Sequence, residues 1–228
     1  MHATDPVMPP VTASDPVRET FRSALARADR RTDPFGHWLL DRPWPDAVAQ
    51  QMEALPIAVS DMTYRLGRRE ENNAARAYFD PAQQARLPAC RAVAEALQDP
   101  RTIAAIEALC DVDLTGSYLR IEYAQDTEGF WLEPHTDIGV KRFTLLAPLT
   151  SGPEAADWGT DFYAGPDQPA QRQPFRANTA LIFVPSESTW HGFEARPITG
   201  VRRSLIINYV GPEWRARHEL CFPDQPIG

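Results

Sequence analysis

The chain has 228 residues, a length that suits one domain with a sizeable core. Its 31 acidic and 23 basic residues give a net charge of −8, the wrong sign for a protein that binds nucleic acid or anionic lipid. The three cysteines are Cys90, Cys110 and Cys221, which form no CxxC pair and therefore indicate neither a disulfide framework nor a thiolate zinc site. No segment approaches the roughly 20 apolar residues of a membrane span. We therefore expect a cytoplasmic protein that binds neither nucleic acid nor membrane.

The N-terminal half is predicted to be mainly helical. Residues 1–15 are rich in Pro, Thr, Ser and Asp, and we expect a flexible leader without the features of a signal peptide. Residues 16–228 are predicted to form a single domain. Apolar residues at helical spacing, such as Val17 and Phe21, predict helices up to about residue 114. A short apolar run bounded by prolines, residues 33–43, predicts one early strand.

After residue 114 the pattern changes to short β-type segments divided by turn residues. These are "GSYLRIEYA", "KRFTLLAPLT", "TDFYAG", "TALIFVP", "WHGFEARP" and "RRSLIINYV". Their close spacing leaves no room for intervening helices, so an antiparallel sandwich or barrel is favoured over a parallel sheet. We expect an α+β, mainly β fold: a double-stranded β-helix (jelly roll) over about residues 115–211, buttressed by the N-terminal helices and followed by a short C-terminal tail.

Two residues with metal-binding side chains lie two apart in "WLEPHTDIGVKRFTLL". On a strand, His135 and Asp137 would point to the same face and stand side by side. Of the other histidines, only His191 lies among the late strands. Two imidazoles and one carboxylate form the facial set that holds Fe(II) while leaving positions open for oxygen and an organic co-substrate. A lone strand histidine with a structural hydrogen bond is the alternative for each.

The last predicted strand, "RRSLIINYV", begins with two arginines. Alternation would place Arg202, Ser204 and Asn208 on one face and Arg203 on the other. An arginine that faces into a barrel needs an anionic partner, and no acidic residue is present on this strand. We therefore expect a carboxylate ligand from outside the protein, bound by Arg202 and the Ser204 hydroxyl. A pair of surface arginines at a strand entrance is the alternative.

Together, "HTD" and "WHGFEARPITGVRRSLIINYV" resemble the H-x-D…H…R-x-S signature of the Fe(II)/2-oxoglutarate-dependent dioxygenases, in their prolyl-4-hydroxylase-like branch. The resemblance extends over about residues 33–211. It implies that His135, Asp137 and His191 bind the iron and that Arg202 and Ser204 bind the distal carboxylate of 2-oxoglutarate. Pro148 departs from the pattern, since many relatives have a tyrosine there, and "WGTDF" lacks the usual double glycine.

The resemblance implies Fe(II), 2-oxoglutarate and O₂ as cofactor and co-substrates, with ascorbate as an auxiliary reductant. The implied reaction is oxidative decarboxylation of 2-oxoglutarate to succinate and CO₂, coupled to hydroxylation of a C–H bond; desaturation and ring formation use the same chemistry. We expect a small polar substrate such as an amino acid, a sugar or a natural-product intermediate. Two alternatives stay open: a prolyl hydroxylase that acts on a protein, and a cupin-like jelly roll that binds a metal or ligand without oxygenase activity.

Residues flanking the ligands are the candidates for substrate contact. The predicted set comprises Tyr123, Trp131, Glu133 and Asn208, with Asn72 and Asn73 as further candidates. A core aromatic is the competing interpretation for Trp131, and a solvated loop for the two adjacent asparagines. The sequence carries no signal for an oligomeric state.

Overall fold

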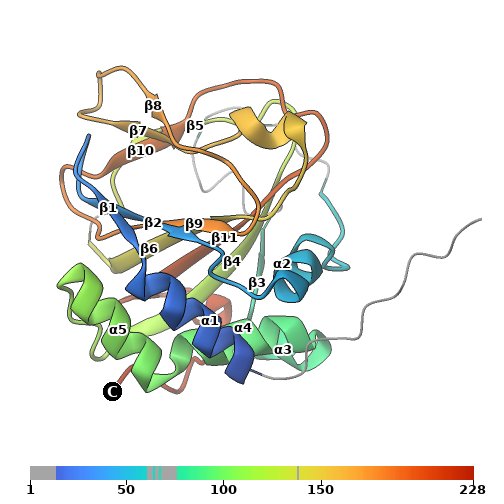
Figure 1. Cartoon of the computed structure of the whole chain (residues 1–228), viewed down its shortest axis with the longest axis vertical. Coiled ribbons are helices and arrows are strands. Elements are labelled where there is room, and N and C mark those ends of the chain that lie inside the picture. Colours follow the sequence, from blue (N-terminus) through green and yellow to red (C-terminus); the bar gives the residue numbers. More distant parts are fainter. Residues whose placement is uncertain (1–13, 61–63, 65–66, 68–75, 138) are drawn as a thin grey trace, which may run out of the picture.

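The computed structural model describes residues 14–60, 64, 67, 76–137 and 139–228. It consists of a layer of helices beneath a large antiparallel sheet, with a smaller sheet above it (Figure 1). No described helix is both long enough and apolar enough to cross a membrane.

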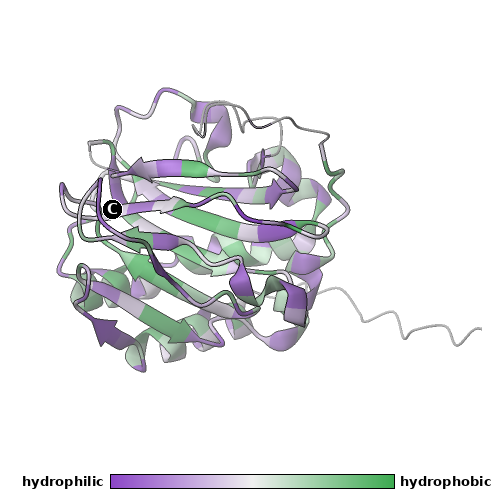
Figure 2. Cartoon of the chain, turned by 90° about the horizontal axis from the view of Figure 1, so that it is seen from above, coloured by the Kyte–Doolittle hydropathy of each residue, from purple (hydrophilic) through white to green (hydrophobic). Residues whose placement is uncertain are grey.

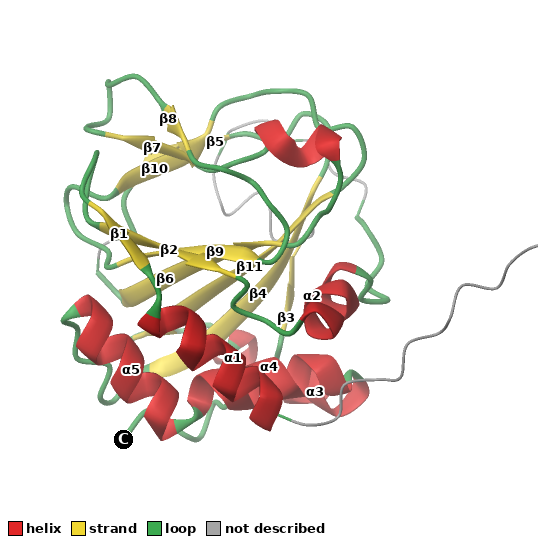
Figure 3. Cartoon of the chain, in the orientation of Figure 1, coloured by secondary structure: helices red, strands yellow, loops and turns green. Residues whose placement is uncertain are grey.

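The described part of the N-terminal half contains five α-helices, and several begin at a proline that suits the first helical turn. They are α1 (Asp15–Ala26), α2 (Asp46–Glu53), α3 (Pro81–Arg86), α4 (Pro88–Gln98) and α5 (Pro100–Cys110). The side chain of Asp99 accepts from the backbone of Arg101 and Thr102, which caps α5. Figure 3 shows α1, α3, α4 and α5 packed under the larger sheet, with α2 beside its edge.

Seven strands form the larger sheet in the order β1-β2-β9-β6-β11-β4-β3. They are β1 (Asp29–Arg31), β2 (His37–Asp41), β9 (Thr179–Phe183), β6 (Lys141–Pro148), β11 (Arg202–Val210), β4 (Tyr118–Asp126) and β3 (Arg76–Tyr78). The smaller sheet has the order β5-β10-β7-β8. Its strands are β5 (Leu132–His135), β10 (Trp190–Phe193), β7 (Asp161–Tyr163) and β8 (Gln171–Arg172). Two 3-10 turns, η2 (Pro153–Asp157) and η3 (Arg217–Glu219), complete the described elements.

The two faces of the larger sheet have different roles. Its strands contain both apolar and polar residues, as Figure 2 shows by hydropathy. One face packs on the helices and forms the main core with residues such as Tyr123, Leu205 and Tyr209. The Tyr209 hydroxyl donates to the carbonyl of Leu97 in α4 at 2.6 Å, which ties the sheet to the helical layer. The other face looks toward the smaller sheet and carries most of the buried charge.

The expected mainly β fold with N-terminal helices is confirmed, and all six predicted β segments contain strands. The early strand is present as β2, but the same half of the chain also supplies β1 and β3 to the larger sheet. These two were missed because each has only three residues and little apolar content. Of the predicted leader, residues 1–13 lie outside the described residues, and α1 already includes Asp15.

Arg120, in the middle of β4, is fully buried. Its Nε and Nη2 each lie 2.5 Å from a carboxylate oxygen, of Glu219 and Glu122 respectively. The guanidinium lies between the rings of Tyr78 and Trp214, at 4.8 and 5.1 Å from their centroids. Burial opposes its charge, but the two carboxylates outweigh burial and raise the pKa of Arg120 above its ordinary value. Arg120 thus joins the C-terminal turn η3 to the centre of the sheet.

Replacing Arg120 with Met should destabilise the fold by about 3–5 kcal/mol, because the buried Glu122 and the partly buried Glu219 would lose a shared partner. Urea unfolding followed by circular dichroism measures the change. Arg42→Met is the control, since Arg42 pairs with Asp46 at the surface, where both side chains are more than half exposed. Arg42→Met should lower the free energy of unfolding by less than about 1 kcal/mol. Equal decreases in the free energy of unfolding for the two variants would contradict a stabilising role for the ion pairs of Arg120.

Candidate functional site

Three metal-binding side chains meet between the two sheets. His135 ends β5 and lies directly opposite His191 on the antiparallel partner β10, so the two imidazole centroids are 4.3 Å apart. Asp137 follows two residues after the end of β5, and its carboxylate oxygens lie 3.8 and 3.7 Å from the Nε2 atoms of His135 and His191. One atom from each of the three residues falls within 4.8 Å of the others. The expectation that both His135 and Asp137 lie on a strand is wrong, since the strand ends at His135.

A glycine permits this close pairing. Gly192 follows His191, and a Cβ built there would lie 2.7 Å from the carbonyl oxygen of Leu132 in β5. Any side chain at this position would push the two strands apart. The glycine therefore brings both histidines to one point.

Both histidines are held in the same tautomer. The Nδ1 atom of His135 lies 2.9 Å from the carbonyl oxygen of Glu133, and Nδ1 of His191 lies 2.9 Å from that of Thr189. A carbonyl only accepts, so each Nδ1 carries the proton and each Nε2 keeps its lone pair for a metal. Burial lowers the pKa of His191 to about 4, with the Asp137 carboxylate opposing it, so this imidazole is neutral at pH 7.

Asp137 is held as a carboxylate by its neighbours. Its Oδ1 lies 2.6 Å from Nζ of Lys141, and its Oδ2 accepts from the Thr144 hydroxyl at 3.2 Å. Burial alone would raise the pKa of Asp137, but the Lys141 ammonium and the two imidazoles lower it well below its usual range. Two imidazoles that present Nε2 and one ionised carboxylate fit a divalent first-row metal such as Fe(II).

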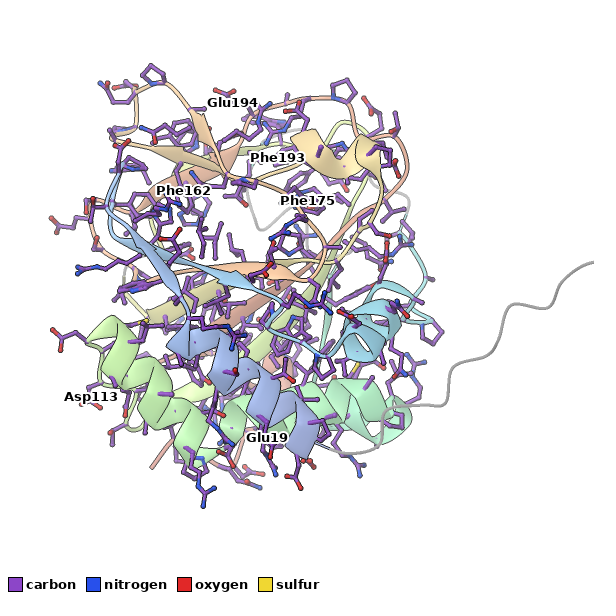
Figure 4. All side chains as sticks on the ribbon, viewed as in Figure 1. Glu19, Asp113, Phe162, Phe175, Phe193 and Glu194 are labelled. Atoms are coloured by element: carbon purple, nitrogen blue, oxygen red, sulfur yellow. The ribbon has the colours of Figure 1, made fainter. Side chains whose placement is uncertain are left out.

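The three residues open into a cavity of about 360 Å³ between the sheets. Arg202 and Ser204, predicted to face into the barrel, also line this cavity. The Arg202 guanidinium lies among three phenylalanine rings, at 4.8 Å from Phe193, 5.2 Å from Phe175 and 5.9 Å from Phe130. Phe175 and Phe193 are labelled in Figure 4, where they lie on the side of the smaller sheet. The cavity thus contains a metal-binding set at one place and a cationic group at another.

Arg202 was expected to find its anionic partner outside the protein, and that expectation is corrected. Its strand has no acidic residue, but Asp126 on the neighbouring strand β4 lies directly opposite, with Oδ2 2.6 Å from Nη1 of Arg202. Nε of Arg202 donates to the carbonyl of Trp158 at 2.8 Å. Within the described residues, Nη2 of Arg202 and the Ser204 hydroxyl have no hydrogen-bond partner. An external carboxylate would therefore meet an arginine that already has one internal carboxylate.

Two of the residues predicted to contact substrate do not line the cavity. Tyr123 was expected there, but it lies on the helix-facing side of β4, fully buried in the main core. The expectation was wrong because Tyr123 alternates with Glu122, which does line the cavity. Asn208 does share the face of Arg202, as predicted. However, it is fully buried and bonded to Arg120, to Thr144 and to the Phe143 carbonyl, so it supports the site from beneath.

Trp131 and Glu133 also lie outside the cavity lining. The Trp131 ring packs on Gly67, where an added Cβ would come within 2.3 Å of it. The Glu133 side chain is exposed, and it is the Glu133 carbonyl that serves the site, as the acceptor for His135. Trp131 is half-buried and belongs to none of the described core clusters, so it is not the core aromatic of the competing interpretation. Asn72 and Asn73 lie outside the described residues.

Several cavity residues were missed from the sequence: Arg76, Glu122, Asp126, Lys141 and Thr144. Four of them line the cavity, and Thr144 supports Asp137. One signal was available in "RIEYAQD", where all three charged residues, Arg120, Glu122 and Asp126, fall on the same face of β4. Such a distribution of charge on a buried strand indicates an inward polar face.

No family model matches the sequence, and no curated protein matches it. Solved structures do match, and they share the fold. A prolyl 4-hydroxylase from Phytophthora capsici gives a TM-score of 0.61 at 15% identity, covering 92% of this chain and 69% of that one.

A prolyl hydroxylase from Trichoplax adhaerens, solved with a fragment of hypoxia-inducible factor, gives a TM-score of 0.57 at 12% identity and covers 89% and 91% of the two chains. The non-haem α-ketoglutarate-dependent epimerase of nogalamycin biosynthesis gives 0.50 at 17% identity and covers 85% and 83%. The resemblance that the sequence carries to the prolyl-4-hydroxylase-like branch is thus confirmed at the level of the fold.

Removing either histidine of the cluster should abolish the metal site. Anaerobic calorimetric titration of the wild-type protein with Fe(II) should give one site per chain, and His135→Ala or His191→Ala should give none. His218→Ala is the control, because His218 is exposed in the C-terminal region and remote in sequence from the cluster. Unchanged Fe(II) binding in both His135→Ala and His191→Ala would show that these histidines are not metal ligands.

Proposed function

We propose that the protein is a non-haem Fe(II)/2-oxoglutarate-dependent dioxygenase that hydroxylates a C–H bond of a small polar molecule. The observation that carries the proposal is the shared cavity: His135, Asp137 and His191 form its metal-binding set, and Arg202 and Ser204 line the same space. When bound, the metal and its keto acid supply an oxidant, with succinate and CO₂ as products. The protein's own contribution is to bind, orient and exclude water.

The residues divide this work between two ends of the cavity. The two imidazoles and the ionised Asp137 would offer three donors on one side of a metal, which leaves its other side to the cavity. Arg202 and Ser204 would bind the far carboxylate of the keto acid through a charge-assisted hydrogen bond and a hydroxyl. The three phenylalanine rings around Arg202 keep water from the guanidinium and strengthen its attraction for an anion.

The fold neighbours are consistent with this chemistry but differ in substrate. Two of those described are prolyl hydroxylases, one with a peptide fragment, and the third is an epimerase of antibiotic biosynthesis. We favour a small substrate because the cavity of about 360 Å³ is at the lower end of ligand pockets and would hold the keto acid as well. The acidic net charge of −8 agrees with an uncharged or amine-bearing substrate.

A second candidate is a cupin-like jelly roll that binds a metal and a ligand without oxygenation. The observation that favours it is the Asp126 carboxylate, which already pairs with Arg202. If that pair existed only to neutralise the arginine, no keto acid would be needed. The two candidates differ in whether 2-oxoglutarate binds at all.

Arg202→Met should weaken 2-oxoglutarate binding by about a hundredfold or more, because the ligand would lose a buried, charge-assisted partner worth about 3–5 kcal/mol. The measurement is the visible charge-transfer absorbance that forms when 2-oxoglutarate is titrated into the anaerobic Fe(II) protein. Arg203→Met is the matched control, since Arg203 is the next residue and points to the opposite face of β11. Equal effects would refute the assignment to Arg202, and no absorbance in the wild type would favour the second candidate.

The substrate class can be tested by following succinate formation. We expect coupled turnover with free amino acids, sugars or their conjugates, because a small molecule can enter the cavity whole. Proline-containing peptides and folded proteins form the comparison panel. Coupled turnover with only a peptide or a protein would overturn the small-molecule assignment and support protein hydroxylation.

A further inference from the structure

Asp126 lies between two arginines at the edge of the cavity. Its Oδ2 is 2.6 Å from Nη1 of Arg202 and its Oδ1 is 2.6 Å from Nη1 of Arg76. The Asp126 side chain is only 1% exposed, and all three residues line the cavity. One buried carboxylate is therefore shared by two guanidinium groups.

The backbone fixes this arrangement. Asp126 and Arg202 are direct partners across β4 and β11, and Arg76 on β3 lies opposite Ala124, so its long side chain reaches Asp126 along the sheet. Arg202 is held at two points, by Asp126 at Nη1 and by the Trp158 carbonyl at Nε. A free arginine side chain has many rotamers, and their entropy is lost when it binds a ligand. Here that freedom is already lost before any ligand arrives.

The charges around Asp126 are balanced. Asp126 divides its one negative charge between Arg76 and Arg202, and Glu122 offsets the remaining positive charge from the far side of Arg76. If Arg76 were absent, Asp126 would pair with Arg202 alone, which would leave that arginine with less attraction for a ligand carboxylate. Arg76 is in turn held by Glu122, whose Oε1 lies 2.8 Å from its Nε.

We propose that Asp126 is a positioning residue that holds Arg202 in the orientation needed to bind a carboxylate ligand, and that Arg76 holds Asp126. This inference rests on the proposed function, in which the ligand is the far carboxylate of 2-oxoglutarate. Asp126 does not bind the ligand; it acts through Arg202. If Asp126 instead kept Arg202 from its ligand, Asp126→Asn would bind 2-oxoglutarate more tightly than the wild type.

The protein contains a matched control for Asp126. Asp161 is also fully buried between two arginines, with Oδ1 3.1 Å from Nε of Arg172 and Oδ2 2.7 Å from Nη1 of Arg196. It does not line the cavity. Asp126→Asn and Asp161→Asn therefore remove the same kind of bridging charge from two places, and only one of them supports Arg202.

The experiment measures the Kd of 2-oxoglutarate for the anaerobic Fe(II) protein, together with the Kd of Fe(II) and the urea midpoint. Asp126→Asn should raise the Kd of 2-oxoglutarate at least about tenfold, equivalent to about 1.4 kcal/mol, and leave the Kd of Fe(II) unchanged. Asp161→Asn should lower the urea midpoint and leave both Kd values unchanged. Arg76→Gln, which removes the support of Asp126, should also raise the Kd of 2-oxoglutarate and serves if Asp126→Asn does not fold.

A double-mutant cycle separates positioning from general damage. In an Arg202→Met background, Asp126→Asn should change the Kd of 2-oxoglutarate by less than about twofold, because the residue through which it acts is gone. The inference is overturned by similar effects at Asp126 and Asp161, by tighter binding in Asp126→Asn, or by an undiminished effect in the Arg202→Met background. A wild type that binds Fe(II) but no 2-oxoglutarate would instead overturn the proposed function, and the inference with it.

Discussion

The cavity side of the larger sheet depends on the neutralisation of buried charge. Three carboxylates and three guanidinium groups alternate in one chain of ion pairs: Glu219, Arg120, Glu122, Arg76, Asp126 and Arg202. An unpaired charge at any of these buried positions would cost several kcal/mol, so no member can be removed without exposing its neighbours to that cost. The chain begins at the C-terminal turn and ends at the arginine in the cavity.

A second branch joins the metal-binding end to the same chain. Nη1 of Arg120 donates to Oδ1 of Asn208 at 3.3 Å, and Nδ2 of Asn208 donates to the Thr144 hydroxyl at 3.0 Å. Thr144 in turn donates to Asp137. Arg120 is therefore connected by hydrogen bonds to the carboxylate of the candidate metal site and, through the ion pairs, to Arg202. The two ends of the cavity are held by one buried polar network, which fixes their separation more firmly than packing alone.

The sequence was sufficient for the features that depend on local pattern. Alternation assigned Arg202, Ser204 and Asn208 to one face of the last strand, and the register of β11 against β4 agrees. Alternation does not identify the residue that lies opposite Arg202 on the neighbouring strand. That pairing depends on the register between strands, which the sequence of one strand does not encode. Asp126 was missed for this reason.

Tyr123 was assigned to the cavity because its strand precedes the HxD segment. However, the face that a strand turns toward the core depends on the distribution of apolar and charged residues along the whole strand. In β4, the residues flanking Tyr123 are Glu122 and Ala124, and the charged residues of the strand occupy the even positions from Arg120 to Asp126. A helix-facing core accepts the large aromatic ring, and the tyrosine hydroxyl reaches the Glu53 carbonyl at 3.4 Å. The charged positions must then face the cavity, where partners from β3 and β11 are present.

The charge balance of the cavity agrees with the proposed binding of a metal and a dicarboxylate together. Its lining includes five basic and five acidic side chains, so the protein itself supplies no net charge there. A divalent cation at the histidine pair adds two positive charges, and a dianionic keto acid removes them again. A divalent cation or a dianion alone would leave two uncompensated charges in a space of low dielectric constant, which is costly. Asp126 is part of this balance. Without the Asp126 carboxylate, the cavity would carry an excess positive charge even when both ligands were bound.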